Sequence, residues 1–225
     1  MKEILYHGSK SIVGTPIYRV GKLYNDYGLG FYCTREADMA REWSVGYNQS
    51  GYVNKYSIET EDLHILNLSD GHYNILHWLA ILLENRTFDV RTDFAVEAKE
   101  YLLEHFLPCY ENADIIIGYR ADDSYFSFAQ DFISNSISLR TLSKAMRLGK
   151  LGEQVVIKSE KAFDLIRFEG YEYVPAEEWF LKKELRDDAA RMEYREIRRA
   201  PREKDDLYMI QILNEEIDAN DSRIW

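Results

Sequence analysis

Three short segments of the chain carry side chains that could bind and activate a small ligand. The segment "YHGS" contains His7, "GLGFYCT" contains Tyr32 after two glycines, and "EQVVIK" begins with Glu153. An imidazole can hold a hydroxyl group, an aromatic ring can stack on a flat ring, and a carboxylate can stabilise positive charge in a transition state. Each segment alone is also typical of an ordinary strand, so their order along the chain carries the information.

The elements that must position these residues predict a mixed α+β chain. Alternating or compact apolar stretches predict strands, and apolar residues three or four positions apart predict helices. The predicted strands are 3–7, 30–34, 52–58, 63–68, 113–118, 153–159 and one within 162–174. The first predicted helix is capped by Thr34 and carries Trp43, and two more cover 75–83 and 93–106. A fourth helix is capped by Asp122 or Asp123, and a fifth by Ser138. Two further helices lie within 176–219, separated by Pro201.

The composition limits the classes of function. The 225 residues are 46% hydrophobic and carry a net charge of -11, which argues against a broad basic surface for nucleic acid but leaves room for a local basic cleft. The longest apolar run is too short to span a bilayer and no leader pattern is present, so we expect a cytoplasmic protein without a membrane partner. Cys33 and Cys109 have neither disulfide nor zinc spacing, so we expect reduced thiols and no metal site.

In this order, the three segments resemble the ADP-ribosyltransferase fold, in the branch that includes diphtheria toxin and the poly(ADP-ribose) polymerases. The "HG", "GxGxY" and strand-initial Glu motifs of that branch match here. More narrowly, "ADIIIGYRADDSYFSFAQDFI" and "RLGKLGEQVVIKSEKAF" are similar to the bacterial family catalogued as domain of unknown function 3990, over about residues 3–170. The resemblance implies an ADP-ribosyltransferase-like domain over 1–174, with a split β-sheet core and flanking helices. We expect 175–225 to form a charged helical C-terminal extension.

The resemblance implies NAD as the substrate and gives roles to the first two segments. In the related enzymes the histidine donates a hydrogen bond to a hydroxyl of the nicotinamide-side ribose, and the next glycine approaches the nicotinamide amide. These roles fall on His7 and Gly8, with Ser9 beside them. Tyr32 would stack on the nicotinamide ring, and Trp43, eleven residues later, would lie against the opposite face. Two aromatic faces attract a flat cationic ring.

The resemblance gives Glu153 the glutamate position, where a carboxylate holds a ribose hydroxyl and stabilises the oxocarbenium-like charge. Because side chains alternate along a strand, only one of Glu153 and Gln154 can face the cleft. We expect Glu153 there; if Gln154 faces the cleft instead, NAD binding or slow hydrolysis is favoured over transfer. Arg120 follows a predicted buried strand and is a candidate for contacting the phosphates of NAD or the acceptor, since a guanidinium binds phosphate in a bidentate way.

Together these roles imply an NAD-dependent mono-ADP-ribosyltransferase, in the setting of a bacterial toxin or defence effector. The acceptor would be a macromolecule, either protein or nucleic acid. Two alternatives stay open: an NAD glycohydrolase, in which water is the acceptor, and a module that binds NAD or ADP-ribose without turnover. The charged segment after residue 175 could dock a further partner, such as a neutralising protein.

Overall fold

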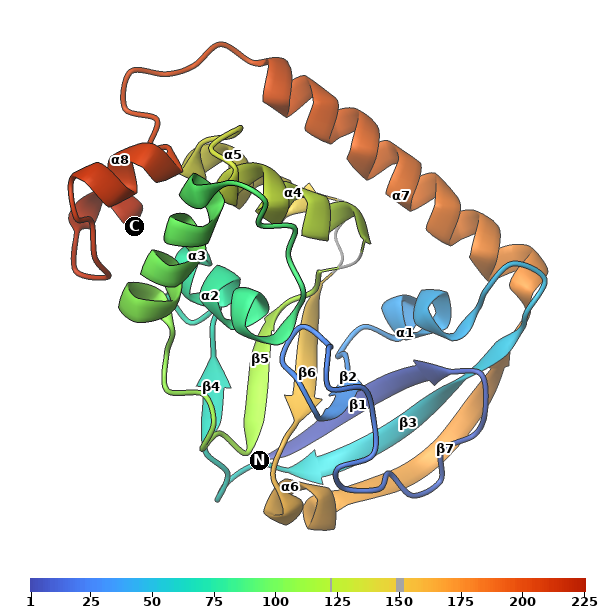
Figure 1. Cartoon of the computed structure of the whole chain (residues 1–225). Coiled ribbons are helices and arrows are strands. Elements are labelled where there is room, and N and C mark those ends of the chain that lie inside the picture. Colours follow the sequence, from blue (N-terminus) through green and yellow to red (C-terminus); the bar gives the residue numbers. More distant parts are fainter. Residues whose placement is uncertain (122, 149–151) are drawn as a thin grey trace.

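Two β-sheets form the framework of the protein in the computed structural model, which describes residues 1–121, 123–148 and 152–225 (Figure 1). The antiparallel three-stranded sheet has the order β1 (Lys2–Ser9), β3 (Gly51–Glu59) and β7 (Ile166–Val174). The four-stranded sheet has the order β2 (Phe31–Cys33), β6 (Glu153–Ile157), β5 (Ile115–Tyr119) and β4 (Ile65–Asn67), of which β4 and β5 are parallel. The predicted α+β class is confirmed.

A single β-bridge joins the two sheets. The backbone N–H of Tyr6 donates to Thr34 O at 2.8 Å, and the N–H of Thr34 donates to Tyr6 O at 2.9 Å. Apolar side chains from both sheets, among them Leu5, Tyr56 and Val155, pack between them as one fully buried cluster. The bridge therefore places β1 beside β2 over a dry core.

Most helices lie on the side of the four-stranded sheet, and α1 (Ala37–Ser44) lies over part of the three-stranded sheet (Figure 1). The others are α2 (Ile75–Asn85), α3 (Asp93–Phe106), α4 (Asp123–Ile133), α5 (Leu139–Ala145), α6 (Glu160–Leu165), α7 (Ala176–Arg199) and α8 (Met209–Asn214), followed by the short 3₁₀ helix Ser222–Ile224. The helix α2 is apolar on every side because it lies inside the largest core cluster, against the four-stranded sheet and α3. No helix in the described ranges is long and apolar enough to cross a membrane.

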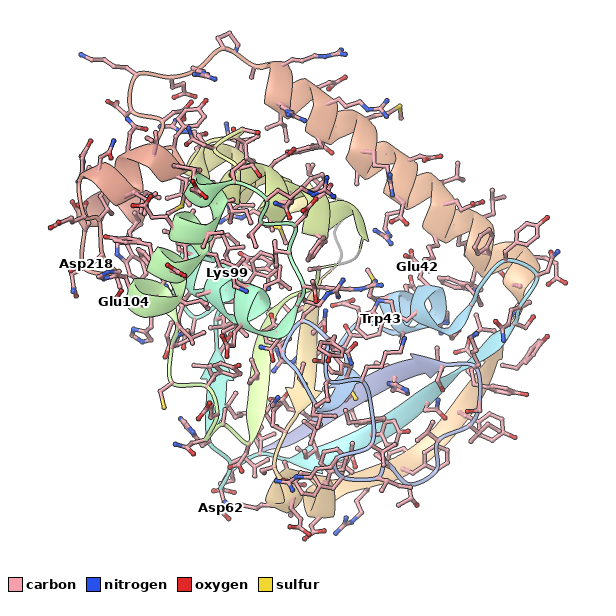
Figure 2. The ribbon with its side chains drawn as sticks, in the orientation of Figure 1. Glu42, Trp43, Asp62, Lys99, Glu104 and Asp218 are labelled. Carbon is pink, nitrogen blue, oxygen red and sulfur yellow. The ribbon has the colours of Figure 1, made fainter. Side chains whose placement is uncertain are left out.

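The C-terminal segment packs onto the rest of the chain. The ring of Tyr194 on α7 stacks on Phe128 with centroids 3.8 Å apart, and its hydroxyl bonds to Asp131 at 2.7 Å. Near the middle of α7, Arg186 donates to Glu42 on α1 at 2.7 Å, and both side chains are mostly buried. Figure 2 labels Glu42 below α7, at the surface where the two helices meet. The extension thus braces α1 and α4 at once.

One local prediction, the helix cap at Thr34, differs from the structure. The first residue before α1 is Glu36, and the Thr34 hydroxyl instead accepts from the Glu36 N–H, so Thr34 forms a turn and does not cap the helix. The predicted strand within 162–174 is confirmed as β7, and the short helix α6, capped by Ser159, precedes it. Asp122, one of two predicted caps for α4, lies outside the described residues.

Gly8 and Gly51 let α1 approach the three-stranded sheet closely. A Cβ on Gly8 would lie 2.0 Å from Ala40 O, and a Cβ on Gly51 would lie 2.1 Å from Ser44 O. Both obstacles are backbone atoms, which cannot turn aside as a flexible side chain can. The close packing of α1, which carries Trp43, therefore requires glycine at these two positions.

We expect Gly8→Ala to lower the free energy of unfolding by about 2 kcal/mol or more, because the added methyl group forces α1 off the sheet. Chemical denaturation measures this change. Gly14→Ala is the matched control, since a Cβ at Gly14 meets nothing within 4 Å, and it should change the value by less than about 0.5 kcal/mol. Equal changes in the two variants would contradict the packing argument.

Candidate functional site

A cavity of about 840 Å³ opens where β1, β2, α1 and β6 meet under the connection between β1 and β2. This volume lies in the range of pockets that bind cofactor-sized ligands. Six of the predicted site residues line it: His7, Gly8, Ser9, Tyr32, Trp43 and Arg120. Five more lining residues bear on its chemistry: Asp26, Lys10 and Lys22 from the same connection, together with Arg86 and Gln154. Glu153 does not line the cavity.

His7 is held by the strand beside it. Its Nδ1 lies 2.7 Å from Tyr32 O, and because a carbonyl oxygen only accepts, Nδ1 must donate. Burial lowers the pKa of His7 below 6.5, although the hydrogen bond to Tyr32 opposes this, so the imidazole is neutral at pH 7. Its Nε2 then carries a lone pair and can only accept a hydrogen bond, whereas the resemblance implies a histidine that donates one.

Tyr32 can offer a ligand its aromatic ring, whereas its hydroxyl is already hydrogen-bonded within the protein. The hydroxyl donates to Gly28 O at 2.6 Å and accepts from the Tyr27 N–H at 3.1 Å, so both bonds go to its own connecting loop. Burial raises the pKa of this hydroxyl far above its ordinary value, and it stays protonated. Tyr32 can therefore serve as a fixed aromatic wall, and proton transfer by it is disfavoured.

Trp43 also lines the cavity, and the Arg120 guanidinium lies over its indole ring. The Arg120 guanidinium carbon lies 4.9 Å from the centroid of the indole ring, which is a cation–π contact. Figure 2 labels Trp43 on the side of α1 toward the centre of the molecule. A ligand ring that stacks on Trp43 must use its other face or displace Arg120, so the expected two-sided aromatic slot is not preformed.

The prediction that the Glu153 side chain faces the cleft is wrong. Glu153 shares a face of β6 with Val155 and Ile157, which are buried between the two sheets. At the end of the strand this face emerges at the surface, where the Glu153 carboxylate lies 3.5 Å from Arg35. Gln154 has the opposite parity, is 4% exposed and lines the cavity. The side chain beside the expected ribose position is thus an amide.

A buried carboxylate that the sequence did not single out lies next to this amide. Asp26 Oδ2 accepts from Gln154 Nε2 at 2.8 Å and from the Ala121 N–H at 2.9 Å, and Oδ1 accepts from Arg86 at 2.9 Å. Burial raises the pKa of Asp26, while these three donors oppose the shift. Hydrophobic periodicity in the sequence does not mark either residue of this ion pair. Asp26 lies in an irregular connection, and Arg86 lies directly after the end of α2.

The cavity is basic within an acidic protein. Its described lining holds four cationic side chains, Lys10, Lys22, Arg86 and Arg120, against the single carboxylate of Asp26. The whole chain has a net charge of -11. A lining of this sign favours an anionic ligand and is the local basic cleft that the sequence left open.

The family described as "Protein of unknown function (DUF3990)" matches residues 3–168. The chain belongs to this family. No curated protein and no solved structure matches the chain. All lining residues of the cavity fall within the DUF3990 match, whereas α7 and α8 follow it. The cavity is therefore a feature of the DUF3990 part of the chain.

We expect nitrogen NMR to show His7 neutral at pH 7, with the proton on Nδ1. Its folded-state pKa lies below 6.5, so the unfolded chain binds this proton more readily and the free energy of unfolding falls as the pH falls from about 6.5 through the folded-state value. His7→Gln lacks the titrating group and should show a smaller loss between pH 7 and pH 5. Identical pH profiles in the two proteins would contradict the burial of a neutral imidazole.

Proposed function

We propose that this cavity binds NAD and that the protein is an NAD-dependent mono-ADP-ribosyltransferase. The observation that carries the proposal is the convergence of three strands on one cavity: β1 brings His7, β2 brings Tyr32 and β6 brings Gln154. This is the arrangement that the resemblance implies, with glutamine in place of the expected glutamate. The substrate and the reaction rest on that resemblance together with the chemistry of the lining.

The lining suits the nicotinamide, its ribose and the pyrophosphate of NAD. The ring of Tyr32 offers an apolar face to the nicotinamide, and His7 Nε2 offers an acceptor to a ribose hydroxyl. Arg120 and the two lysines of the connecting segment offer positive charge to the pyrophosphate. The volume of about 840 Å³ is of the size that such a ligand requires.

In the proposed reaction, the bond between C1′ of the ribose and the nicotinamide nitrogen breaks, and its electron pair leaves with nicotinamide. A nucleophile of the acceptor forms the new bond to C1′ and releases a proton. Positive charge develops on the ribose in the transition state, and fixed dipoles around it lower the barrier. The oxygen end of the Gln154 amide is such a dipole, although it is weaker than a carboxylate.

The placement of Gln154 also favours a second candidate, an NAD-binding module with slow hydrolysis or no turnover. An amide cannot act as a general base for an acceptor hydroxyl at neutral pH. The single carboxylate among the described lining residues, Asp26, is already hydrogen-bonded to three donors. Binding without transfer is therefore the main competitor.

Incubation of the purified full chain with NAD labelled in its adenylate half separates these functions. Label on a macromolecule supports transfer, free ADP-ribose supports hydrolysis, and intact NAD with calorimetric binding supports the binding module. Intact NAD without binding contradicts the proposal as a whole.

For an active protein, we expect Gln154→Ala to lower kcat/KM by about 100-fold, since it removes a dipole at the reacting carbon. His7→Ala should act in the same direction through loss of the ribose contact. Glu153→Ala is the matched control and should change kcat/KM by less than about twofold, because it breaks only a partly exposed ion pair outside the cavity. A larger loss in Glu153→Ala than in Gln154→Ala would contradict the assigned site.

We expect Arg120→Gln to weaken NAD binding by about tenfold while leaving nicotinamide riboside, which lacks the pyrophosphate, unchanged. Calorimetry measures both affinities. Arg140→Gln on α5 is the control, because Arg140 pairs with Glu203 and Asp206 away from this cavity. Equal weakening of the two ligands would show that Arg120 acts through Trp43 and not through phosphate.

A further inference from the structure

Asp26 is the point at which four parts of the cavity wall meet. Its side chain comes from the connection between β1 and β2 and is almost completely buried. Its three donors come from elsewhere in the chain: Arg86 follows α2, Ala121 follows β5 and Gln154 lies in β6. No other acidic side chain of the described residues lines the cavity. Asp26 therefore fixes the relative position of groups that approach the ligand from different elements.

The Asp26 carboxylate determines which way the Gln154 amide points. An ionised carboxylate only accepts hydrogen bonds, so Gln154 must direct its NH₂ group toward Asp26, as the 2.8 Å contact has it. The amide is planar, and its oxygen then points away from Asp26. No other described residue bonds to this amide, and Gln154 lines the cavity. The oxygen is thereby left for a donor on the ligand.

We propose that Asp26 is a positioning residue that holds Gln154 Oε1 toward the cavity and so makes the site select a ligand with a free ribose hydroxyl. The identity of that hydroxyl, on the nicotinamide ribose of NAD, rests on the proposed function. Oε1 of Gln154 and Nε2 of His7 are both acceptors, and the two residues line one cavity. Two acceptors match a ribose that presents two hydroxyl donors, whereas a rotated amide would present an NH₂ group in place of one acceptor.

A purely structural role for Asp26 makes a different prediction. If Asp26 served only as a buried ion-pair partner of Arg86, loss of its charge alone would abolish the preference for a ligand with a free ribose hydroxyl. Asn at position 26 separates the two roles, since its single oxygen can still accept from Ala121 and Gln154. Its NH₂ group would then face Arg86, whose side chain is 26% exposed and can turn to water. Asp26→Asn therefore keeps the amide orientation, and Asp26→Ala removes it.

The first measurement needs no ligand. In the NMR spectrum of the full chain, we expect the side-chain NH₂ protons of Gln154 to exchange slowly with solvent in the wild type and in Asp26→Asn. They should exchange quickly in Asp26→Ala, and Gln154→Ala assigns the resonance. The exposed Gln49 is the internal control for fast exchange. Fast exchange of Gln154 in the wild type would overturn the proposal, even if Asp26→Ala failed to fold.

The second measurement compares NAD with an analogue that carries hydrogen in place of the 2′-hydroxyl of the nicotinamide ribose. We expect the wild type and Asp26→Asn to bind NAD more tightly by about five- to tenfold, and Asp26→Ala and Gln154→Ala to lose this preference. A full preference in Asp26→Ala, or its loss in Asp26→Asn, would overturn the proposal. If no form binds NAD, the proposed function fails, while the exchange measurement still decides the role of Asp26.

Discussion

The pair of backbone hydrogen bonds between Tyr6 and Thr34 is the constraint on which the site depends. The two sheets have no strand in common, and this bridge fixes one beside the other. It places His7 against Tyr32 O, independently of the path of the long connection between them. A slip of one residue would turn His7 toward α1, where the close packing at Gly8 leaves no room for a side chain. The register of the bridge and the packing of α1 therefore reinforce each other.

The charges of the cavity are arranged so that positive charge remains available. Arg86 is neutralised by Asp26, whereas Lys10 and Lys22 extend from the connecting segment. Residues 10–25 contain three basic side chains and no acidic one, in a chain of net charge -11. The net negative charge disfavours the approach of an anion, whereas the basic lining attracts an anion at this cavity. The acidic composition thus sharpens the preference for that cavity.

The sequence was sufficient to predict the strands of the site but not the orientation of every side chain in them. His7 and Tyr32 follow from short apolar strands beside glycines, and the structure brings them together. The parity of β6 could not be read, because "VVI" is apolar on both faces: Val155 and Ile157 pack between the sheets and Val156 packs toward the helices. Asp26 belongs to an irregular segment, in which neither periodicity nor propensity marks a buried polar residue.

The end of the family match has a consequence for the folding unit. Residue 168 lies inside β7, and the remainder of that strand covers β3 from Gly51 to Lys55. A fragment that stopped there would leave these backbone N–H and C=O groups on an open sheet edge, which can pair with strands of other molecules and so promote aggregation. In the full chain these groups pair with Gly170–Val174, and β7 becomes the edge strand of the sheet that carries His7. The backbone pairing of this sheet therefore continues six residues beyond the end of the family match.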